Sequence, residues 1–179
     1  TKFALAQGRV NQVVADDWLT QWVKDNPEHR LARRMLAERH LQKGDYELAQ
    51  SDYEQLVKWH SADAGVFNNY AHILKRLGDP RALEIAERAQ ELAPNDPNIN
   101  DTLGWMLVEA GDPQRGLAFL RNAHSRAGLN PAIRYHIAVA LSKLDRRDEA
   151  QRELQRALAS PRSFREREQA EELLRTMSK

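Results

Sequence analysis

Apolar and polar positions recur along this chain with a period of 33 or 34 residues. Each copy has a turn containing Gly-Asp or Asp-Arg, followed by a helix-forming segment with a small residue near its start. The four copies are Gly44-Asp45-Tyr46 with Ala49, Gly78-Asp79-Pro80 with Ala82, Gly111-Asp112-Pro113 with Gly116, and Asp145-Arg146-Arg147 with Ala150. Self-similarity at this period is typical of stacked helical hairpins, because one hairpin cannot bury its apolar face alone.

The repeat predicts an all-α fold, a right-handed superhelical solenoid of antiparallel helix hairpins closed by a C-terminal capping helix. We expect one domain over residues 1–179, made of a partial N-terminal hairpin at 1–29, repeats at 30–63, 64–96, 97–130 and 131–163, and a capping helix at 164–179. The first helices are predicted at 30–43, 64–77, 98–110 and 131–144, and the second helices at 46–59, 80–93, 114–127 and 147–160. A preceding helix is predicted over 11–25.

Two local signals support these helices. A small residue follows an apolar one in each first helix, as in Leu36-Ala37, Tyr70-Ala71, Leu103-Gly104 and Ile137-Ala138, and we expect it to let the second helix approach closely. Asp79-Pro80 and Asp112-Pro113 are typical of a helix cap followed by a first-turn proline, where the missing N–H costs nothing. The proline-containing segments at 26–27, 94–97 and 130–131 are interpreted as separators between hairpins.

Composition narrows the partners that the chain could have. The formal charge is +1, with 30% charged residues, so no overall field favours nucleic acid or an anionic membrane. Residues 121–179 hold 13 Lys and Arg against 8 Asp and Glu, but acids are interleaved with them, as on a solvated helix face. Cysteine is absent and no long apolar run occurs, so we expect no disulfide and no membrane insertion by this segment. Because the chain begins with Thr1, a targeting segment is expected upstream.

The sequence holds no recognisable catalytic constellation. It lacks a glycine-rich phosphate loop, HExxH and GxSxG, and its six histidines never pair with another ligand at one-turn spacing. Adjacent carboxylates such as Asp16-Asp17 and Glu171-Glu172 diverge along a helix, so they are interpreted as solvated charge. We therefore expect no enzymatic activity, no cofactor and no metal, and a function in binding.

The repeat resembles the tetratricopeptide repeat (TPR) family over nearly the whole chain. The bulky aromatic that often opens the first helix in this family is kept only as Phe67, whereas Arg33, Asn100 and Arg134 stand in the other copies. The strings at 68–71, 78–83, 101–105 and 133–138, with Phe164 before the cap, are similar to the C-terminal region of bacterial TPR lipoproteins that accompany exosortase (PEP-CTERM) and exopolysaccharide gene clusters. This resemblance implies a protein of the bacterial envelope, lipid-anchored through an upstream segment and facing the periplasm; a cytoplasmic location stays open.

A stack of such hairpins has a concave groove lined by the first helices, and we expect a protein or peptide partner to bind there. The groove candidates are Arg34, Glu38, Gln42, Asn68, His72, Lys75, Asp101, Trp105, Val108, Tyr135, Val139 and Ser142. Trp105 beside Tyr135 could be a rigid aromatic anchor or could fill a gap against the next hairpin, and the sequence leaves both open. Trp18, Trp22 and Trp59 are expected to be structural.

Three functions remain open at this stage. The first is a non-enzymatic protein-interaction scaffold that assists assembly of an exopolysaccharide export or exosortase sorting system. The second is a carbohydrate-binding module in which Trp105 and Tyr135 stack on sugar rings. The third is the regulatory repeat region of a larger enzyme such as a glycosyltransferase. Two copies could also associate through an open N-terminal edge formed by Val13, Trp18 and Trp22.

Overall fold

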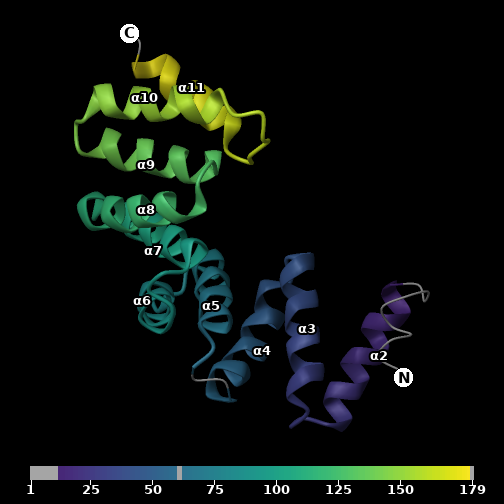
Figure 1. Cartoon of the computed structure of the whole chain (residues 1–179). Helices are drawn as coiled ribbons and strands as arrows, with labels where there is room; N and C mark the ends of the chain where they lie inside the picture. Colours follow the sequence, from purple (N-terminus) through teal and green to yellow (C-terminus); the bar gives the residue numbers. More distant parts are fainter. Residues whose placement is uncertain (1–11, 60–61, 178–179) are drawn as a thin grey trace. The chain divides into compact units, whose positions relative to one another are not determined.

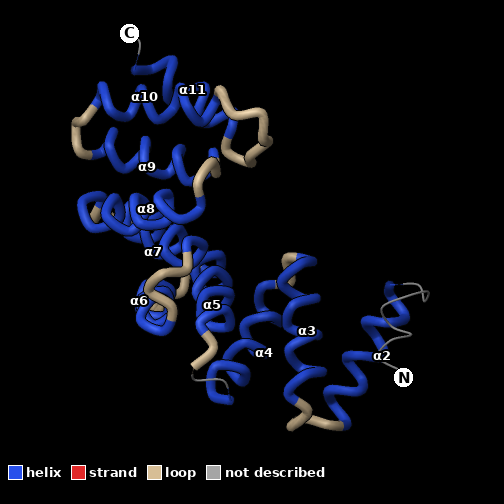
Figure 2. The backbone as a smooth tube through the Cα atoms, viewed as in Figure 1, coloured by secondary structure: helices blue, strands red, loops and turns tan. Residues whose placement is uncertain are grey.

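The computed structural model describes residues 12–59 and 62–177, and all regular secondary structure within these ranges is α-helical (Figures 1 and 2). The helices are α2 (Gln12–Asp25), α3 (Arg30–Lys43), α4 (Tyr46–Trp59), α5 (Ala64–Leu77), α6 (Ala82–Leu92), α7 (Pro97–Glu109), α8 (Pro113–Ala127), α9 (Pro131–Lys143), α10 (Arg147–Leu158) and α11 (Arg167–Met177). The beginning of the partial N-terminal hairpin expected at 1–29 lies outside the described residues.

The chain divides into two compact units, Thr1–Ala82 and Leu83–Lys179, and the boundary falls at the first turn of α6. In the first unit α2 packs on α3, α3 on α4, and α4 on α5. In the second, α7 packs on α8, α8 on α9, α9 on α10, and α10 on α11, and α7 also contacts α9. From α2 to α5 and from α7 to α11, helices that follow one another in the chain therefore pack together, as the repeat predicts.

The predicted ranges of α2 to α10 agree with the observed ones to within two residues, and α3, α4 and α5 match at both ends. The capping helix was predicted from residue 164 and begins three residues later, at Arg167. At α6 the predicted start is two residues too early. Pro80 and Arg81 form a turn in which the Asp79 carboxylate accepts a hydrogen bond from the Arg81 backbone N–H at 2.9 Å, so the helix begins at Ala82.

Three helices of the second unit begin with the same cap chemistry. Asp96 before α7, Asp112 before α8 and Asn130 before α9 each accept backbone N–H hydrogen bonds from the first turn, and each is followed by a proline at the first helical position. Only the second of these was predicted as a cap. The interpretation of the other two as separators between hairpins was incomplete, because the same residues also begin the next helix.

The first unit is held by buried apolar side chains on α3, α4 and α5, by an apolar cluster between α2 and α3, and by buried charges. Leu19, Val23, Ala32 and Leu36 form the cluster, and the stacked rings of Trp18 and Trp22, 5.4 Å apart, pack against it. Asp16 is buried and pairs with Lys43 of α3 at 2.7 Å, so its interpretation as solvated charge was wrong.

Between α3 and α4, the carboxylate of Asp52 is buried. It accepts a hydrogen bond from Arg33 at 2.9 Å and lies 3.0 Å from His40 Nδ1. At the end of α4, the Trp59 ring lies beneath the guanidinium groups of Arg30 and Arg33, at 5.9 and 5.6 Å.

The core of the second unit runs continuously from α7 to α11. Its largest fully buried side chains are Leu103, Leu107, Val108, Leu120, Ile133, Leu141 and Leu154. Gly104 of α7 meets Gly116 of α8 so closely that a methyl group at Gly116 would lie 2.6 Å from the Gly104 carbonyl oxygen. The small residue in the first helix thus allows the close approach that the sequence predicts.

The last helix, α11, covers the end of this core. Ala170 and Met177 are buried against it, and Leu173 and Leu174 pack at its edge. Arg147 and Gln151 of α10 each donate a hydrogen bond of 2.8 Å to the Met177 carbonyl oxygen. These contacts fix α11 over the apolar surface that α9 and α10 leave open, as expected of a capping helix.

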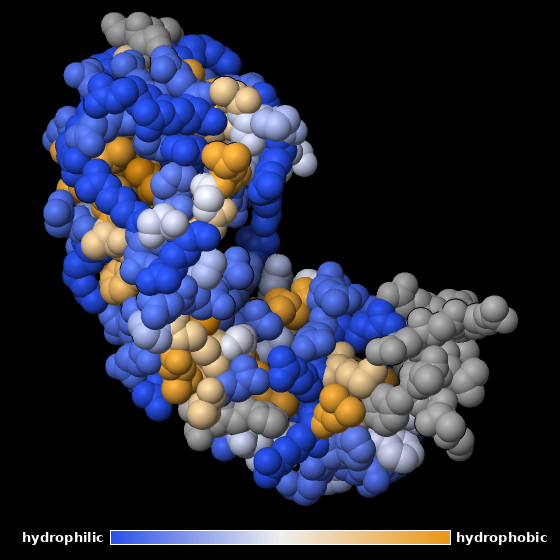
Figure 3. Space-filling model, viewed as in Figure 1, coloured by the Kyte–Doolittle hydropathy of each residue, from blue (hydrophilic) through white to orange (hydrophobic). Residues whose placement is uncertain are grey.

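The surface drawn in Figure 3 is mostly hydrophilic, and apolar atoms appear in separate patches. Among the described residues the exposed large apolar side chains are Leu31, Leu48 and Leu129. No helix in these ranges combines the length and apolar character that a bilayer span requires.

Candidate binding site

The predicted groove residues of the first unit come from α3 and α5. Arg34 donates hydrogen bonds to Glu38, at 3.1 Å, and to Asp63, at 3.0 Å, so α3 is tied to the residue that caps α5. The hydrogen bond to Glu38, more than the charge of Asp63, raises the pKa of Arg34 and fixes the guanidinium as a cation. Within the first unit, the structure therefore brings Arg34 and Glu38 into one polar group.

The α5 candidates differ in exposure. His72 is exposed, Lys75 is half-buried, and the Asn68 amide has a buried Oδ1 that accepts no hydrogen bond within the described residues. A buried carbonyl oxygen without a donor costs free energy unless a ligand or water supplies one. Asn68 is thus the α5 candidate with the clearest unmet hydrogen-bonding capacity.

The predicted residues of the second unit form a tighter group, which we call the α7–α9 cluster: Asp101 and Trp105 from α7, and Tyr135 and His136 from α9. The Trp105 ring stacks on the His136 ring with centroids 4.4 Å apart and planes inclined by 22°. The Tyr135 ring lies 6.1 Å from Trp105 in a tilted arrangement. His136 Nδ1 lies 2.7 Å from the Asp101 carboxylate.

Hydrogen bonding and ring stacking fix the orientation of the side chains in this cluster. The Asp101 carboxylate accepts the hydrogen bond when Nδ1 carries the proton, which sets the plane of the imidazole, and the imidazole in turn sets the plane of the indole. Burial raises the pKa of Tyr135, with smaller contributions from Glu166 and Glu109, so the phenol stays neutral and keeps its O–H as a donor. The cluster offers two oriented aromatic rings beside a carboxylate and a hydroxyl.

The sequence left open whether Trp105 is an exposed binding residue or a core residue. In the structure its side chain is partly exposed and partly packed on the core. Its ring is half-buried and packs against the core of the second unit, as do Tyr135 and Val139. Val108 is different: its side chain is fully buried against Gly116, so its place among the groove candidates was wrong. Helical spacing placed it one turn after Trp105 and two turns after Asp101, but the valine packs against the small Gly116 of α8 instead.

His136 is the member of the cluster that the sequence did not single out, and it is buried and packs on Trp105. Its partner Asp101 precedes it by 35 residues, one more than the repeat. The two residues lie on successive first helices, and an Asp and a His about one repeat apart were the signal available in the sequence. In the described ranges no group of three or more His, Asp or Glu could hold a metal ion.

Comparisons with known proteins agree with the repeat. Two family models, both described as tetratricopeptide repeat, match residues 35–63 and 107–167. Among solved structures, MamA (residues 41 to end) from Desulfovibrio magneticus RS-1 is 19% identical, with 84% of each chain covered and a TM-score of 0.74. YrrB, described as a TPR protein with an unusual peptide-binding site, is 19% identical over 80% of this chain and 75% of its own, with a TM-score of 0.69. The comparison with curated proteins gave no match.

A third structure, of MamA from MSR-1, is 25% identical over 72% of this chain and 75% of its own, with a TM-score of 0.65. All three are solenoids of helix pairs, and the likeness extends over most of the described chain. The fold is therefore that of a TPR solenoid, as the sequence predicts.

Proposed function

We propose that this chain, which carries tetratricopeptide repeats in both of its units, is a non-enzymatic scaffold that binds an extended segment of a protein partner through the α7–α9 cluster. The observation that carries the proposal is the stack of Trp105 on His136, held in turn by Asp101. A ring fixed in this way loses little conformational entropy on binding, which is why Trp and Tyr dominate binding hot spots.

The chemistry of the cluster suits an extended peptide. Its rings can contact apolar side chains, while the Asp101 carboxylate and the Tyr135 hydroxyl can pair with backbone N–H and C=O groups that an extended chain leaves free. YrrB is described as a peptide-binding protein of the same fold, which supports a peptide as the ligand class. Val139 would extend the apolar part of the contact along α9.

The first unit would supply a second set of contacts from Arg34, Glu38, Asn68, His72 and Lys75. Arg34 and Glu38 present opposite charges side by side, and Asn68 has an acceptor that is not satisfied within the described residues. These residues favour a polar stretch of the partner, in contrast to the aromatic contact at the α7–α9 cluster.

We also propose that the partner belongs to a bacterial exopolysaccharide export or exosortase sorting system, and that the full protein acts on the periplasmic side of the envelope through an upstream lipid anchor. The support is the resemblance of the strings at 68–71, 101–105 and 133–138 to envelope TPR lipoproteins. Capture of export or sorting components from an envelope extract would test this assignment, and consistent capture of cytosolic proteins alone would reject it.

The binding proposal is tested with Trp105→Ala in that capture experiment, followed by titration with the captured partner. We expect the partner's affinity to fall by about tenfold or more, because central aromatic anchors carry about 2 kcal/mol or more of binding free energy. Trp59→Ala is the matched control, since it removes a half-buried tryptophan from the other unit. If Trp105→Ala lowers the free energy of unfolding but leaves affinity unchanged, the residue is core and the site is wrong.

The closeness of Trp105 and Tyr135 also favours a second candidate, binding of an oligosaccharide by ring stacking. Titration with defined oligosaccharides separates the two, because sugar stacking on Trp105 would quench its fluorescence saturably while a peptide-specific site would give no response.

A further inference from the structure

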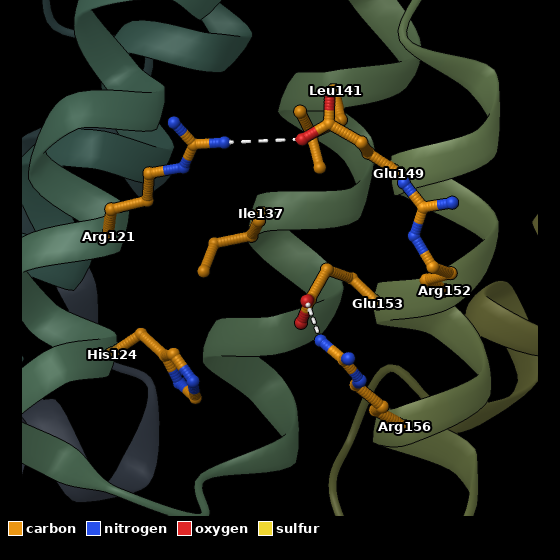
Figure 4. Close-up of a pocket in the computed structure, with 8 residues that line it drawn as sticks. All are labelled: Arg121, His124, Ile137, Leu141, Glu149, Arg152, Glu153 and Arg156. Atoms are coloured by element: carbon orange, nitrogen blue, oxygen red, sulfur yellow. Dashed lines mark hydrogen bonds and ion pairs between the residues drawn. The ribbon is translucent and has the colours of Figure 1, made fainter.

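A cavity of about 230 Å³ opens in the second unit between α8, α9 and α10 (Figure 4). Its apolar floor is formed by Ile137 and Leu141 of α9. Its walls are polar, with Arg121 and His124 on α8 and Arg156 on α10. Ile137 and Leu141 project from the opposite side of α9 from Tyr135 and Val139, because residues two and six positions along a helix are rotated by roughly 200° and 240°. The cavity is thus separate from the α7–α9 cluster.

Positive charge is in excess around this cavity. Its two glutamates each have an arginine partner that does not line it: Arg146 donates two hydrogen bonds of 2.7 Å to Glu149, and Arg134 donates one of 2.6 Å to Glu153. The cavity arginines bind the same glutamates less closely, with Arg121 at 3.5 Å from Glu149 and Arg156 at 2.9 Å from Glu153 (Figure 4). Arg121 and Arg156 can therefore turn to an incoming anion while both glutamates stay paired.

The imidazole of His124 is an independent indication that this cavity binds a ligand. Its Nδ1 is buried and accepts or donates no hydrogen bond within the described residues. Burial lowers the pKa of His124, and the nearby charge of Arg134 lowers it further, against an opposing effect of Glu153. A neutral imidazole with an unsatisfied nitrogen beside arginines is a group that an acidic ligand would both pair with and protonate.

A shallow apolar pocket of about 400 Å³ adjoins this cavity at Arg156, which lines both. Leu129, Pro131 and Pro161 form its apolar wall, and the Leu129 side chain is 70% exposed. An apolar side chain of a partner that covered Leu129 and the two prolines would remove their apolar surface from water, which favours binding.

We propose that these two pockets together, named here the Arg121–Arg156 site, bind an acidic linear peptide in which a Glu or Asp adjoins an apolar residue. The carboxylate contacts Arg121, Arg156 and His124, and the neighbouring apolar side chain packs on Leu129 and Pro131. An acidic peptide fits better than a nucleic acid, since the adjoining pocket is apolar and takes a neighbouring apolar side chain, which a phosphate backbone does not offer. The site is independent of the α7–α9 cluster and does not rest on its function.

Fluorescence anisotropy tests this with a fluorescein-labelled 12-residue peptide of repeated Gly-Glu-Leu, compared with the same peptide carrying Gln for Glu. We expect the Glu peptide to bind at least about tenfold more tightly, because the Glu carboxylate makes charge-assisted hydrogen bonds to the arginines that a Gln amide cannot make. The double substitution Arg121→Gln, Arg156→Gln should remove that preference, and Leu129→Ser should weaken both peptides. Arg126→Gln is the matched control, because Arg126 is also exposed on α8 but hydrogen-bonds to Asn95 and Asn122 outside the cavity.

Three outcomes would overturn the proposal: equal binding of the Glu and Gln peptides, equal loss with Arg126→Gln, or displacement of the Glu peptide by an oligothymidylate at equal charge concentration. The last would mean that the arginines form a general polyanion surface. NMR titration of His124 gives a second readout. Its pKa should rise when the Glu peptide is bound, since the new carboxylate offsets the charges of Arg134 and Arg156; an unchanged pKa would exclude His124 from the site.

Discussion

The hairpin α3–α4 of the first unit and the hairpin α7–α8 of the second solve the same packing problem with different residues. In α3–α4 the two helices meet across Arg33, His40 and the buried Asp52. The corresponding positions in α7–α8, each 67 residues later, are Asn100, Leu107 and Phe119. One pair of helices is thus joined in part by buried charges, and the other by apolar side chains and direct backbone contact.

A third hairpin shows that the polar solution is not an accident of one repeat. In α9–α10, Arg134 donates a hydrogen bond of 2.6 Å to Glu153, and this pair has the same separation of 19 residues as Arg33 and Asp52. Arg33 and Arg134 occupy the position where this fold often has an aromatic residue. The repeat therefore tolerates an aromatic residue, an asparagine or an ion pair at that place, and the ion pair forms where the second helix supplies the acid. The polar hairpin should be sensitive to lost charge, and the apolar one to added volume.

The largest effect is expected from Asp52→Ala in α3–α4. The substitution leaves Arg33 and His40 without their shared acceptor, and removing one partner of a mostly buried pair costs about 3 kcal/mol of unfolding free energy. The side chains of Arg33 and Asp52 are only 17% and 8% exposed, so water cannot replace the carboxylate fully. Amide hydrogen exchange resolved by helix should show faster exchange in α3 and α4 and little change in α9 and α10.

A triple variant sharpens this test. Arg33→Asn, His40→Leu and Asp52→Phe together give α3–α4 the residues that α7–α8 has at these positions. The variant removes every ionisable member of the group, so no buried charge is left unpaired, and such a replacement is often neutral. We expect the triple variant to be more stable than Asp52→Ala alone. If it is less stable, the two hairpins are not interchangeable at these positions and the comparison fails.

A smaller effect is expected from Gly116→Ala in α7–α8. The added methyl group would lie 2.6 Å from both the Gly104 carbonyl oxygen and Val108, so the helices must separate. Overpacking of this kind costs about 2 kcal/mol, more than the gain in helix propensity of about 1 kcal/mol offsets. In α4 the same position is Ala49, fully buried, so α3–α4 has room for that methyl group.

Urea unfolding of Gly116→Ala checks this prediction, with Gly65→Ala as control. A methyl group at Gly65 meets only the Asp63 carboxylate, at 3.3 Å, and the control should be neutral or stabilising. Unchanged stability in Gly116→Ala would mean that the α7–α8 backbones can part without loss, and that close contact is not what joins this hairpin.

Most of the fold could be predicted from the sequence, because helix ends depend on local signals. Gly44, Gly78 and the Asp112-Pro113 cap act within a few residues of themselves, and the helices they bound are found where expected. The spacing of the apolar residues then determines which faces of neighbouring helices pack together. The start of α6 was missed for a local reason too, since Asp79 can cap a turn as readily as a helix.

The site was harder to predict because its contacts join different helices. The sequence identified three of its residues, Asp101, Trp105 and Tyr135, because they lie at helix positions that the apolar pattern does not use for packing. The pairing of Asp101 with His136 could not be identified in this way, since it depends on how α7 is rotated against α9. Buried charges were missed for a related reason: helical periodicity treats every charged residue as surface, so Arg33 and Asp52 were not recognised as partners. The recurrence of a 19-residue separation in Arg134 and Glu153 was the evidence that could have joined them.

The smallest expected effect is a pH dependence of stability that the α3–α4 hairpin has and the α7–α8 hairpin lacks. Burial raises the pKa of Asp52, against opposing contributions from His40 and Arg33. The native chain therefore holds this proton more tightly than the unfolded chain, whose Asp titrates near about 3.9. The stability that Asp52 contributes is fully present below that pH and declines as the pH rises through the raised pKa.

The difference in unfolding free energy between the wild type and Asp52→Asn, which cannot titrate, should shift against the wild type between about pH 4 and neutrality. The difference between the wild type and Gly116→Ala should stay constant over the same range, because that substitution removes no titratable group. If the first difference instead shifts in favour of the wild type as pH rises, pairing with Arg33 and His40 outweighs burial, and the polar hairpin is stabilised by its charges at neutral pH.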